Sequence, residues 1–329
     1  MREISPKKIN RRRLKKSHHL YLGVDGGGTK TQIALLDGEK EIIAEGLAGA
    51  SNPLRVGIET AVANILAAVD NACDTSDRNR GDIVSATLGL AGVRREDLRQ
   101  RVRESFNRRL PIEKIEVCTD AEIALYGATL GKAGLVIIAG TGSICIGQND
   151  QDERAAAGGW GPLAGDEGGG AGIARRALQV IAKASDGRGK LTGLSEDAIE
   201  YFRAGRLEDL SVAIYAPQID NARIAGFARF VIEAAKAGDE AATEILREAA
   251  GELALAANTV IHALKLEREK FPIARVGGIF RGGNDLITKP FMEKILQVAP
   301  KAFLIEPLLS PAVAAAQMAF ENCKNGERQ

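Results

Sequence analysis

Three short segments of the chain place glycine beside hydroxyl or acidic side chains: residues 23–31, 140–143 and 277–283. Glycine has no Cβ atom, so the backbone N–H groups of such turns can approach an anion closely, and phosphate is the usual ligand. The two common phosphate-binding patterns do not fit, because Thr29 replaces the lysine of a Walker A loop and Cys145 the last glycine of a dinucleotide fingerprint. Each segment alone is equally typical of a structural hairpin turn.

Charged side chains lie next to these turns. Asp25 follows a short apolar run, where its carboxylate could hold a hydrated Mg²⁺ against phosphates; an aspartate that stabilises the turn is the alternative. Lys30 could stabilise a transferring phosphate or be a solvated hairpin lysine, and the sequence leaves both open. Asp120 ends a predicted strand and opens a predicted helix, where a helix N-cap is the simplest interpretation.

The elements that must position these residues form two series of strands and helices. In the first, apolar patterning predicts strands at 20–24, 33–37, 41–46, 83–90 and 115–119, with helices at 58–72, 95–106 and 121–130. The second opens with strands at 135–139 and 144–147, followed by a loop at 158–172, helices near 173–184, 195–203, 207–216, 221–237 and 240–265, strands at 273–276 and 303–305 around a helix at 285–298, and a last helix at 310–322. Because both series begin with a glycine-turned hairpin, we expect a duplicated α/β domain with a cleft between the copies.

Composition narrows the class of protein. The chain has 329 residues, of which 45% are hydrophobic and 26% charged, as expected for a soluble globular protein of two domains. No apolar run approaches the length of a membrane span and no signal peptide precedes the first strand, so we expect a cytoplasmic protein without a membrane partner. Four scattered cysteines and three histidines show neither zinc spacing nor a disulfide framework.

The first 19 residues differ from the rest. They carry a local charge of +7, against −6 for residues 20–329. Contact with nucleic acid or a membrane surface is one interpretation of such a block. A disordered, solvated tail at 1–19 is the one we adopt, because like-charged blocks are usually disordered, and no nucleic-acid partner is expected.

The order of the glycine segments resembles that of the sugar kinase, heat-shock protein 70 and actin superfamily. Residues 23–31 look like its first phosphate loop, residues 139–143 like the second, and residues 276–279 like its adenosine motif. The run Gly-Gly-Trp-Gly-Pro-Leu-Ala-Gly-Asp-Glu-Gly at 158–168 is similar to that of N-acetylglucosamine kinases within the BadF/BadG/BcrA/BcrD ATPase-type group. Residues 118–121 resemble the segment that carries their catalytic aspartate.

The resemblance implies duplicated actin-like (ribonuclease H-like) ATPase domains at 20–131 and 132–309, with the helix at 310–323 completing the first. It implies ATP with Mg²⁺, a small amino sugar as acceptor, and a homodimer. The expected activity is transfer of phosphate to the 6-hydroxyl of an amino sugar, with N-acetylglucosamine preferred.

The resemblance also assigns roles to residues. Asp120 would be the catalytic base and would contact the sugar, and Asp25 would hold the metal. The nucleotide would be bound by Gly27, Gly28, Thr29, Lys30, Gly140, Thr141, Gly142, Ser143, Ala225, Gly277 and Gly278. The sugar would be bound by Asn52, Gly159, Trp160 and Asp166, although a single tryptophan is more often core packing.

Two departures leave the substrate open. Ile144 stands where related enzymes have asparagine, and Gly169-Gly170 replaces a serine-containing continuation. Glucosamine and N-acetylmuramic acid therefore remain alternative substrates. An activator ATPase of a dehydratase or reductase is a further alternative, although Cys118 and Cys145 lack the spacing of iron–sulfur cluster ligands.

Overall fold

The computed structural model describes residues 19–281 and 285–326. The predicted basic tail therefore lies, except for residue 19, outside the described residues. Within the described part of the chain, no helix is both long and apolar enough to cross a membrane.

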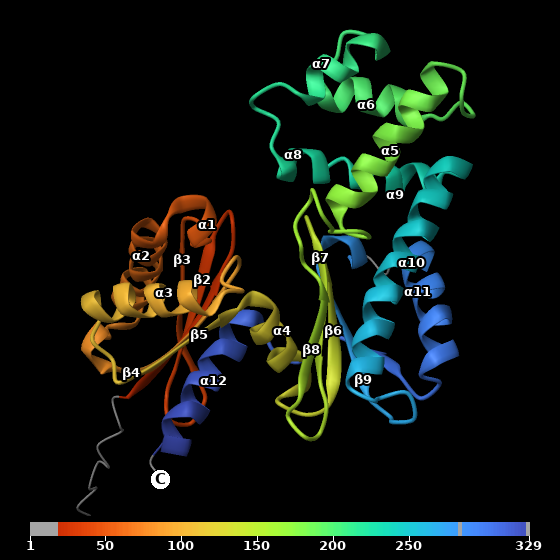
Figure 1. Ribbon diagram of the computed structural model, residues 1–329. Helices are drawn as coiled ribbons and strands as arrows, with labels where there is room; N and C mark the ends of the chain where they lie inside the picture. Colours follow the sequence, from red (N-terminus) through yellow and green to blue (C-terminus); the bar gives the residue numbers. More distant parts are fainter. Residues whose placement is uncertain (1–18, 282–284, 327–329) are drawn as a thin grey trace, which may run out of the picture.

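The first lobe is built on a five-stranded sheet in the order β3-β2-β1-β4-β5 (Figure 1). The strands are β1 (Leu20–Gly26), β2 (Thr31–Leu36), β3 (Ile42–Ala48), β4 (Ile83–Leu90) and β5 (Lys114–Thr119). β1 is antiparallel to β2 and parallel to β4, which is parallel to β5. Helices α2 (Ile58–Ser76) and α3 (Glu96–Arg109) bury their apolar side chains with this sheet, and α1 (Pro53–Val56) is a single turn.

The second lobe repeats this topology. Its sheet has the order β10-β9-β6-β7-β8, with β6 (Gly134–Ala139), β7 (Ser143–Gln148), β8 (Arg154–Gly158), β9 (Pro272–Val276) and β10 (Phe303–Ile305). Read from the other edge, the order is an antiparallel three-strand meander followed by two parallel strands, as in the first sheet. The predicted duplication is thus confirmed, although the two halves share no visible sequence repeat.

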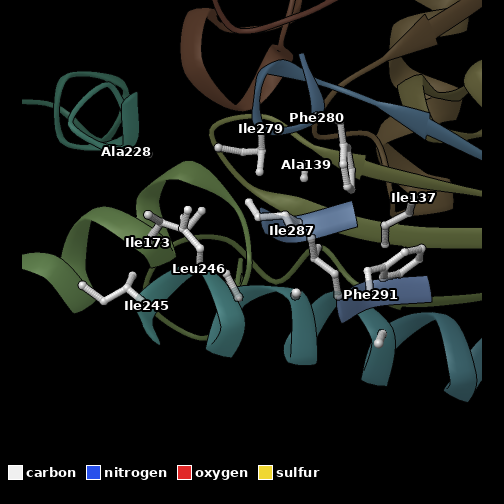
Figure 2. Close-up of a cluster of buried hydrophobic side chains, with 14 of the residues drawn as sticks. Ile137, Ala139, Ile173, Ala228, Ile245, Leu246, Ile279, Phe280, Ile287 and Phe291 are labelled. Atoms are coloured by element: carbon white, nitrogen blue, oxygen red, sulfur yellow. The ribbon is translucent and has the colours of Figure 1, made fainter. Parts of the chain in front are cut away.

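Helices of the second lobe form the larger core. They are α5 (Gly170–Ser185), α6 (Leu194–Phe202), α7 (Leu210–Ile214), α8 (Asn221–Ala225), α9 (Ala228–Lys236), α10 (Glu240–Ala263) and α11 (Asp285–Val298). Figure 2 shows Ile137 of β6 gathered with Leu246 of α10 and Phe291 of α11 in this core.

Two features of this lobe differ from the sequence-based prediction. Strand β8 was not predicted, because its Arg-Ala-Ala-Ala-Gly sequence has none of the β-branched or aromatic residues that signal a strand. The helix predicted over 221–237 is two helices. The Tyr201 hydroxyl donates a hydrogen bond to the Arg223 carbonyl (2.7 Å), while the Phe227 N–H turns to the Ile224 carbonyl (3.0 Å), which interrupts the helical ladder.

Two helices lie between the sheets (Figure 1): α4 (Asp120–Thr129) and α12 (Pro311–Gly326). The alanines of α12 pack on the first sheet, as predicted, so closely that a methyl group on Gly23 would overlap the α12 backbone at Ala312 and Ala316. The apolar face of α4 packs instead on the second sheet. The Gly127 carbonyl of α4 accepts hydrogen bonds from the N–H groups of residues 308 and 309, which join the two helices.

Candidate active site

The parallel strands bring the predicted site residues to one edge of each sheet. In the first sheet, Asp25 of β1 is opposite Gly89 of β4, and Leu90 is opposite Thr119, so Asp25 and Asp120 both lie where strands end. In the second sheet, Ile138 of β6 is opposite Val276 of β9, which places both remaining glycine turns at one end.

A cavity of about 540 Å³ lies between these edges. Its first-lobe wall includes Arg94, Arg99 and Asp120, and its second-lobe wall includes the turn 140–143 and Asp166. The size is typical of a site for a small molecule. Of the residues to which the resemblance assigns roles, those that line this cavity are Asp120, Gly140, Thr141, Gly142, Ser143, Gly159 and Asp166.

The first glycine turn is held by its own backbone. The Gly27 N–H donates to the Lys30 carbonyl (3.0 Å), and the Gly27 carbonyl accepts from the N–H groups of Ser51 and Asn52 (3.1 Å each). The N–H groups of Gly28 and Thr29 have no hydrogen-bond partner among the described residues, so they can donate to phosphate oxygens.

Asp25 lies at the start of this turn, largely buried. Burial, and secondarily the charge of Asp120, raises its pKa to about 6, while Lys30 opposes this rise. Burial also raises the pKa of Asp120. A cation next to Asp25 would relieve the repulsion between the two carboxylates.

Asp120 is the first residue of α4, but it does not cap the helix. Thr119 is the N-cap, because its hydroxyl accepts from the Glu122 N–H (3.2 Å) and the Glu122 carboxylate accepts from the Thr119 N–H (2.7 Å). The Asp120 side chain is exposed and lines the cavity. Its Oδ1 accepts a hydrogen bond from the adjacent Ala121 N–H (3.0 Å). The N-cap interpretation of Asp120 is therefore wrong, and its carboxylate can serve as a base.

The second glycine turn is anchored to the N-terminus of α5. The carbonyls of Gly140 and Thr141 accept from the N–H groups of Gly170 and Ala171 (2.8 and 2.9 Å). A Cβ atom on Gly169 would overlap the backbone of Gly142, and a Cβ atom on Gly142 would overlap the Asp166 carboxylate. The Gly169-Gly170 departure from related sequences therefore has a packing role.

Asp166 contributes to the same turn. It is 7% exposed, has a backbone φ of 63°, and its carboxylate accepts from the Ser143 N–H (3.3 Å). Burial raises its pKa. The structure thus places Asp166 behind Gly142 while it still lines the cavity, so it supports the loop as well as facing a ligand.

The predicted adenosine-side residues adjoin the second turn. Gly277 has a φ of 112°, and a methyl group there would overlap the Ala139 carbonyl. Gly278 begins the short 3₁₀ helix η3 (Gly278–Phe280) and faces open space. Ala225, at the end of α8, is buried against Gly170.

Of the remaining sugar-side residues, Gly159 lines the cavity, whereas Asn52 and Trp160 contact residues that line it, Gly92 and Arg94. Gly159 has a φ of 71° and covers Ile144, whose apolar side chain lines the cavity where asparagine was expected. Asn52 caps α1 through its Oδ1, which accepts from the Leu54 N–H (3.0 Å), and its Nδ2 has no partner within the described structure. Trp160 is 69% exposed, so core packing of this residue is excluded.

Sequence reasoning missed three charged residues. Arg94 and Arg99 line the cavity, and Glu122 joins the lobes by pairing with Arg99 (3.0 Å) and with Arg154 of β8 (3.6 Å). The arginines follow a buried strand without any motif. Glu122, in contrast, could have been found, because Thr119-x-x-Glu122 is a capping-box sequence.

The donors present fit Mg²⁺ but not an iron–sulfur cluster. Magnesium is usually held by one or two carboxylates together with substrate phosphates, and Asp25 meets that need. Among residues 19–281 and 285–326, no three His, Cys, Asp or Glu side chains group as a metal site. Cys118 and Cys145 are buried in separate apolar clusters, and burial raises the pKa of both thiols.

Three relatives that are named as kinases of amino sugars match nearly the whole chain. It is 34% identical over 323 residues to the N-acetyl-D-glucosamine kinase of Dictyostelium discoideum, covering 94% of this chain and 100% of the relative. It is 30% identical over 304 residues to the N-acetylmuramic acid/N-acetylglucosamine kinase of Clostridium acetobutylicum, covering 92% and 98%. The glucosamine kinase GspK of Vibrio cholerae is 27% identical over 290 residues, covering 88% and 94%.

Solved structures of other proteins share the fold of this chain. A candidate N-acetylglucosamine kinase of Chromobacterium violaceum superposes with a TM-score of 0.75 at 26% identity, covering 92% of this chain and 99% of the other. A ROK family glucokinase of Streptomyces griseus shares the fold at a TM-score of 0.56 and 18% identity, covering 92% and 99%. The model of the BadF/BadG/BcrA/BcrD ATPase family matches residues 22–319, and the chain belongs to that family.

Proposed function

We propose that the protein is an ATP-dependent kinase that phosphorylates the 6-hydroxyl of an amino sugar, with N-acetylglucosamine as the preferred acceptor. One observation carries the proposal: a single cavity places the Asp120 carboxylate of one lobe opposite the glycine turn 140–143 of the other. Relatives designated as amino-sugar kinases match the chain over almost its full length.

The residues divide the work of phosphoryl transfer. Asp120 accepts the proton of the sugar hydroxyl as that oxygen bonds to the γ-phosphorus and the bond to the ADP oxygen breaks. The free N–H groups of Gly28 and Thr29 would donate to the phosphates from the first lobe, and Thr141, which lines the cavity, would bind them from the second lobe. When bound next to Asp25, Mg²⁺ neutralises charge on the phosphate oxygens. Lys30 adds a positive charge on the first-lobe side.

An N-acyl sugar is favoured by the donors near the cavity mouth. The Asn52 side chain uses its oxygen for the α1 cap and keeps its Nδ2 free for a carbonyl acceptor such as that of an acetamido group. Glucosamine lacks this carbonyl. We therefore expect glucosamine to be the weaker acceptor of the two.

The test is an ADP-release assay over N-acetylglucosamine, glucosamine and glucose, with the position of the phosphate on the product assigned by NMR. Asp120→Ala should lower kcat by about 10²–10⁴-fold, because the base is lost. Asp97→Ala is the matched control, since that exposed aspartate of α3 pairs with Arg95 on the outer surface. A normal rate in Asp120→Ala, or the absence of sugar-dependent ADP release in the wild type, would refute the proposal.

A further inference from the structure

Arg94 and Trp160 face each other across the cleft. Arg94 lies in the loop between β4 and α3 of the first lobe, and Trp160 in the loop after β8 of the second. The guanidinium carbon is 4.7 Å from the centre of the indole ring. Both side chains are exposed, so this contact is not part of either core.

The charge of Arg94 is uncompensated, unlike that of its neighbours. Arg95 pairs with Asp97 (2.9 Å) and Arg99 with Glu122 (3.0 Å), whereas no carboxylate of the described residues lies within ion-pair distance of Arg94. An exposed cation–π contact contributes about 0.5–1 kcal/mol, and a hydrogen bond to a charged group about 1.5–3 kcal/mol. An anion entering the cavity can therefore draw Arg94 from the ring.

The wall beside Arg94 favours an anion that is attached to carbon. Ile138, Ile144, Ile146 and Ala156 all line the same cavity. Ile144, held under Gly159, presents an apolar side chain to the cavity. A carboxylate on a short aliphatic substituent would pack its carbons on this wall while its oxygens reach the guanidinium. A free phosphate ion has no carbon atoms to pack on this wall, so it would gain nothing from these apolar side chains.

We propose that Arg94 and Trp160 form a substrate-reading gate, in which Arg94 leaves the indole ring to bind a carboxylate carried by an amino-sugar substrate. The gate offers an acidic amino sugar a contact that a neutral sugar of the same ring cannot make. The inference rests on the proposed function, because it assumes that the cavity holds the sugar.

The test compares N-acetylmuramic acid with N-acetylglucosamine, which lacks the carboxylate, by titration calorimetry without ATP. Arg94→Gln should weaken N-acetylmuramic acid binding by about 10- to 100-fold and leave N-acetylglucosamine binding nearly unchanged, since one charge-assisted contact is lost. Arg94→Lys, which retains charge but not the two-pronged geometry, should fall between. Arg95→Gln, the adjacent arginine, is the control and should match the wild type.

Trp160 supplies a second readout, because it is the only tryptophan of the chain. N-acetylmuramic acid should change its fluorescence in the wild type as the cation leaves the ring, and the change should be absent in Arg94→Gln. Equal loss of both sugars, no loss of either, or a raised KM for ATP alone would overturn the gate. Because binding is measured without ATP, a protein that binds these sugars but transfers no phosphate refutes the kinase proposal and still decides the role of Arg94.

Discussion

At the scale of single residues, the site keeps two carboxylates with raised pKa values close together: Asp25, which is partly buried, and Asp120, whose accessible area faces the cavity. Burial and the charge of Asp120 raise the pKa of Asp25 to about 6, and burial raises that of Asp120. A raised pKa is costly for a folded protein at neutral pH, where the Asp25 carboxylate is ionised, and such shifts are typical of functional sites. They suit a base and a cation ligand that face negatively charged phosphates.

Asp25→Asn should make the protein more stable at neutral pH. A carboxyl whose folded-state pKa is raised stabilises the fold fully only below its unfolded pKa of 3.8, and this stability is lost as pH rises through 6. The substitution removes that loss, which is at most roughly 3 kcal/mol. Thermal unfolding at a series of pH values measures it: the gain should be full above pH 6 and vanish near pH 4.

The same variant should lose kinase activity, because the proposed Mg²⁺ ligand is gone. Asp150→Asn, in the exposed turn after β7, is the control and should change neither quantity. If Asp25→Asn is no more stable than the wild type at pH 7.5, burial of this carboxylate is not costly.

At the scale of elements, helix α4 connects the chemistry to the joint between the lobes. Its N-terminus is fixed by the Thr119–Glu122 capping box, and Glu122 also meets Arg99 of α3 and Arg154 of β8. The carboxylate that caps the helix therefore also joins both lobes. The position of Asp120, one residue after the cap, depends on this network.

Thr119→Ala should reduce both stability and catalysis. Loss of an N-cap costs about 0.5–2 kcal/mol of unfolding free energy. Because Asp120 moves with the end of the helix, kcat should also fall by about ten- to hundredfold, with little change in KM for the sugar. Denaturant unfolding and steady-state kinetics measure the two effects.

Asp239→Ala provides the comparison. Asp239 is the N-cap of α10, accepting from the Ala242 N–H (2.9 Å), and it lies away from the cavity. It should lose similar stability with unchanged kcat. Equal kinetic loss in both variants would mean that α4 does not position Asp120.

At the scale of the whole molecule, the C-terminal helix α12 completes the core of the first lobe. Helix α12 closes one face of the first sheet, and α4 packs on the second, so the contact between these helices lies between the lobes (Figure 1). Side-chain contacts across the cleft are Arg55 with Asp220 (3.6 Å), Arg94 with Trp160, and Arg154 with Glu122. Exposed polar contacts of this kind are weak, which allows the lobes to close on a ligand.

Gly23→Ala should separate α12 from the first sheet. The added methyl group would overlap the backbone at Ala312 and Ala316, and overpacking of this kind costs about 1–3 kcal/mol or more. Hydrogen exchange should show lost protection in α12 and β1 together. Gly38→Ala, in an open turn of the same lobe, should have no such effect. Intact protection of α12 in Gly23→Ala would contradict the close packing.

Local pattern was enough to predict most elements and the two-lobed α/β class, because strands and helices have distinct apolar periods. The resemblance to a family whose motifs occur in a fixed order also singled out Asp120, Asp166 and the turn 140–143, which line one cavity. Local pattern did not predict strand β8, because its alanines carry no strand signal. It also did not predict the helix break after Ala225, where the Tyr201 hydroxyl of another helix binds the Arg223 carbonyl.

Only the tertiary structure decided what each side chain does at the site. The spacing Thr119-x-x-Glu122 already indicates the threonine as the helix cap, but only the fold shows that the Asp120 carboxylate, which the cap does not use, faces the cavity. The sequence shows one tryptophan, but not that the ring is exposed beneath an arginine of the other lobe. The burial and ion pairing of a side chain depend on contacts between residues far apart in the chain, which local spacing does not encode. Those contacts determine the charge and the accessibility of the proposed catalytic groups.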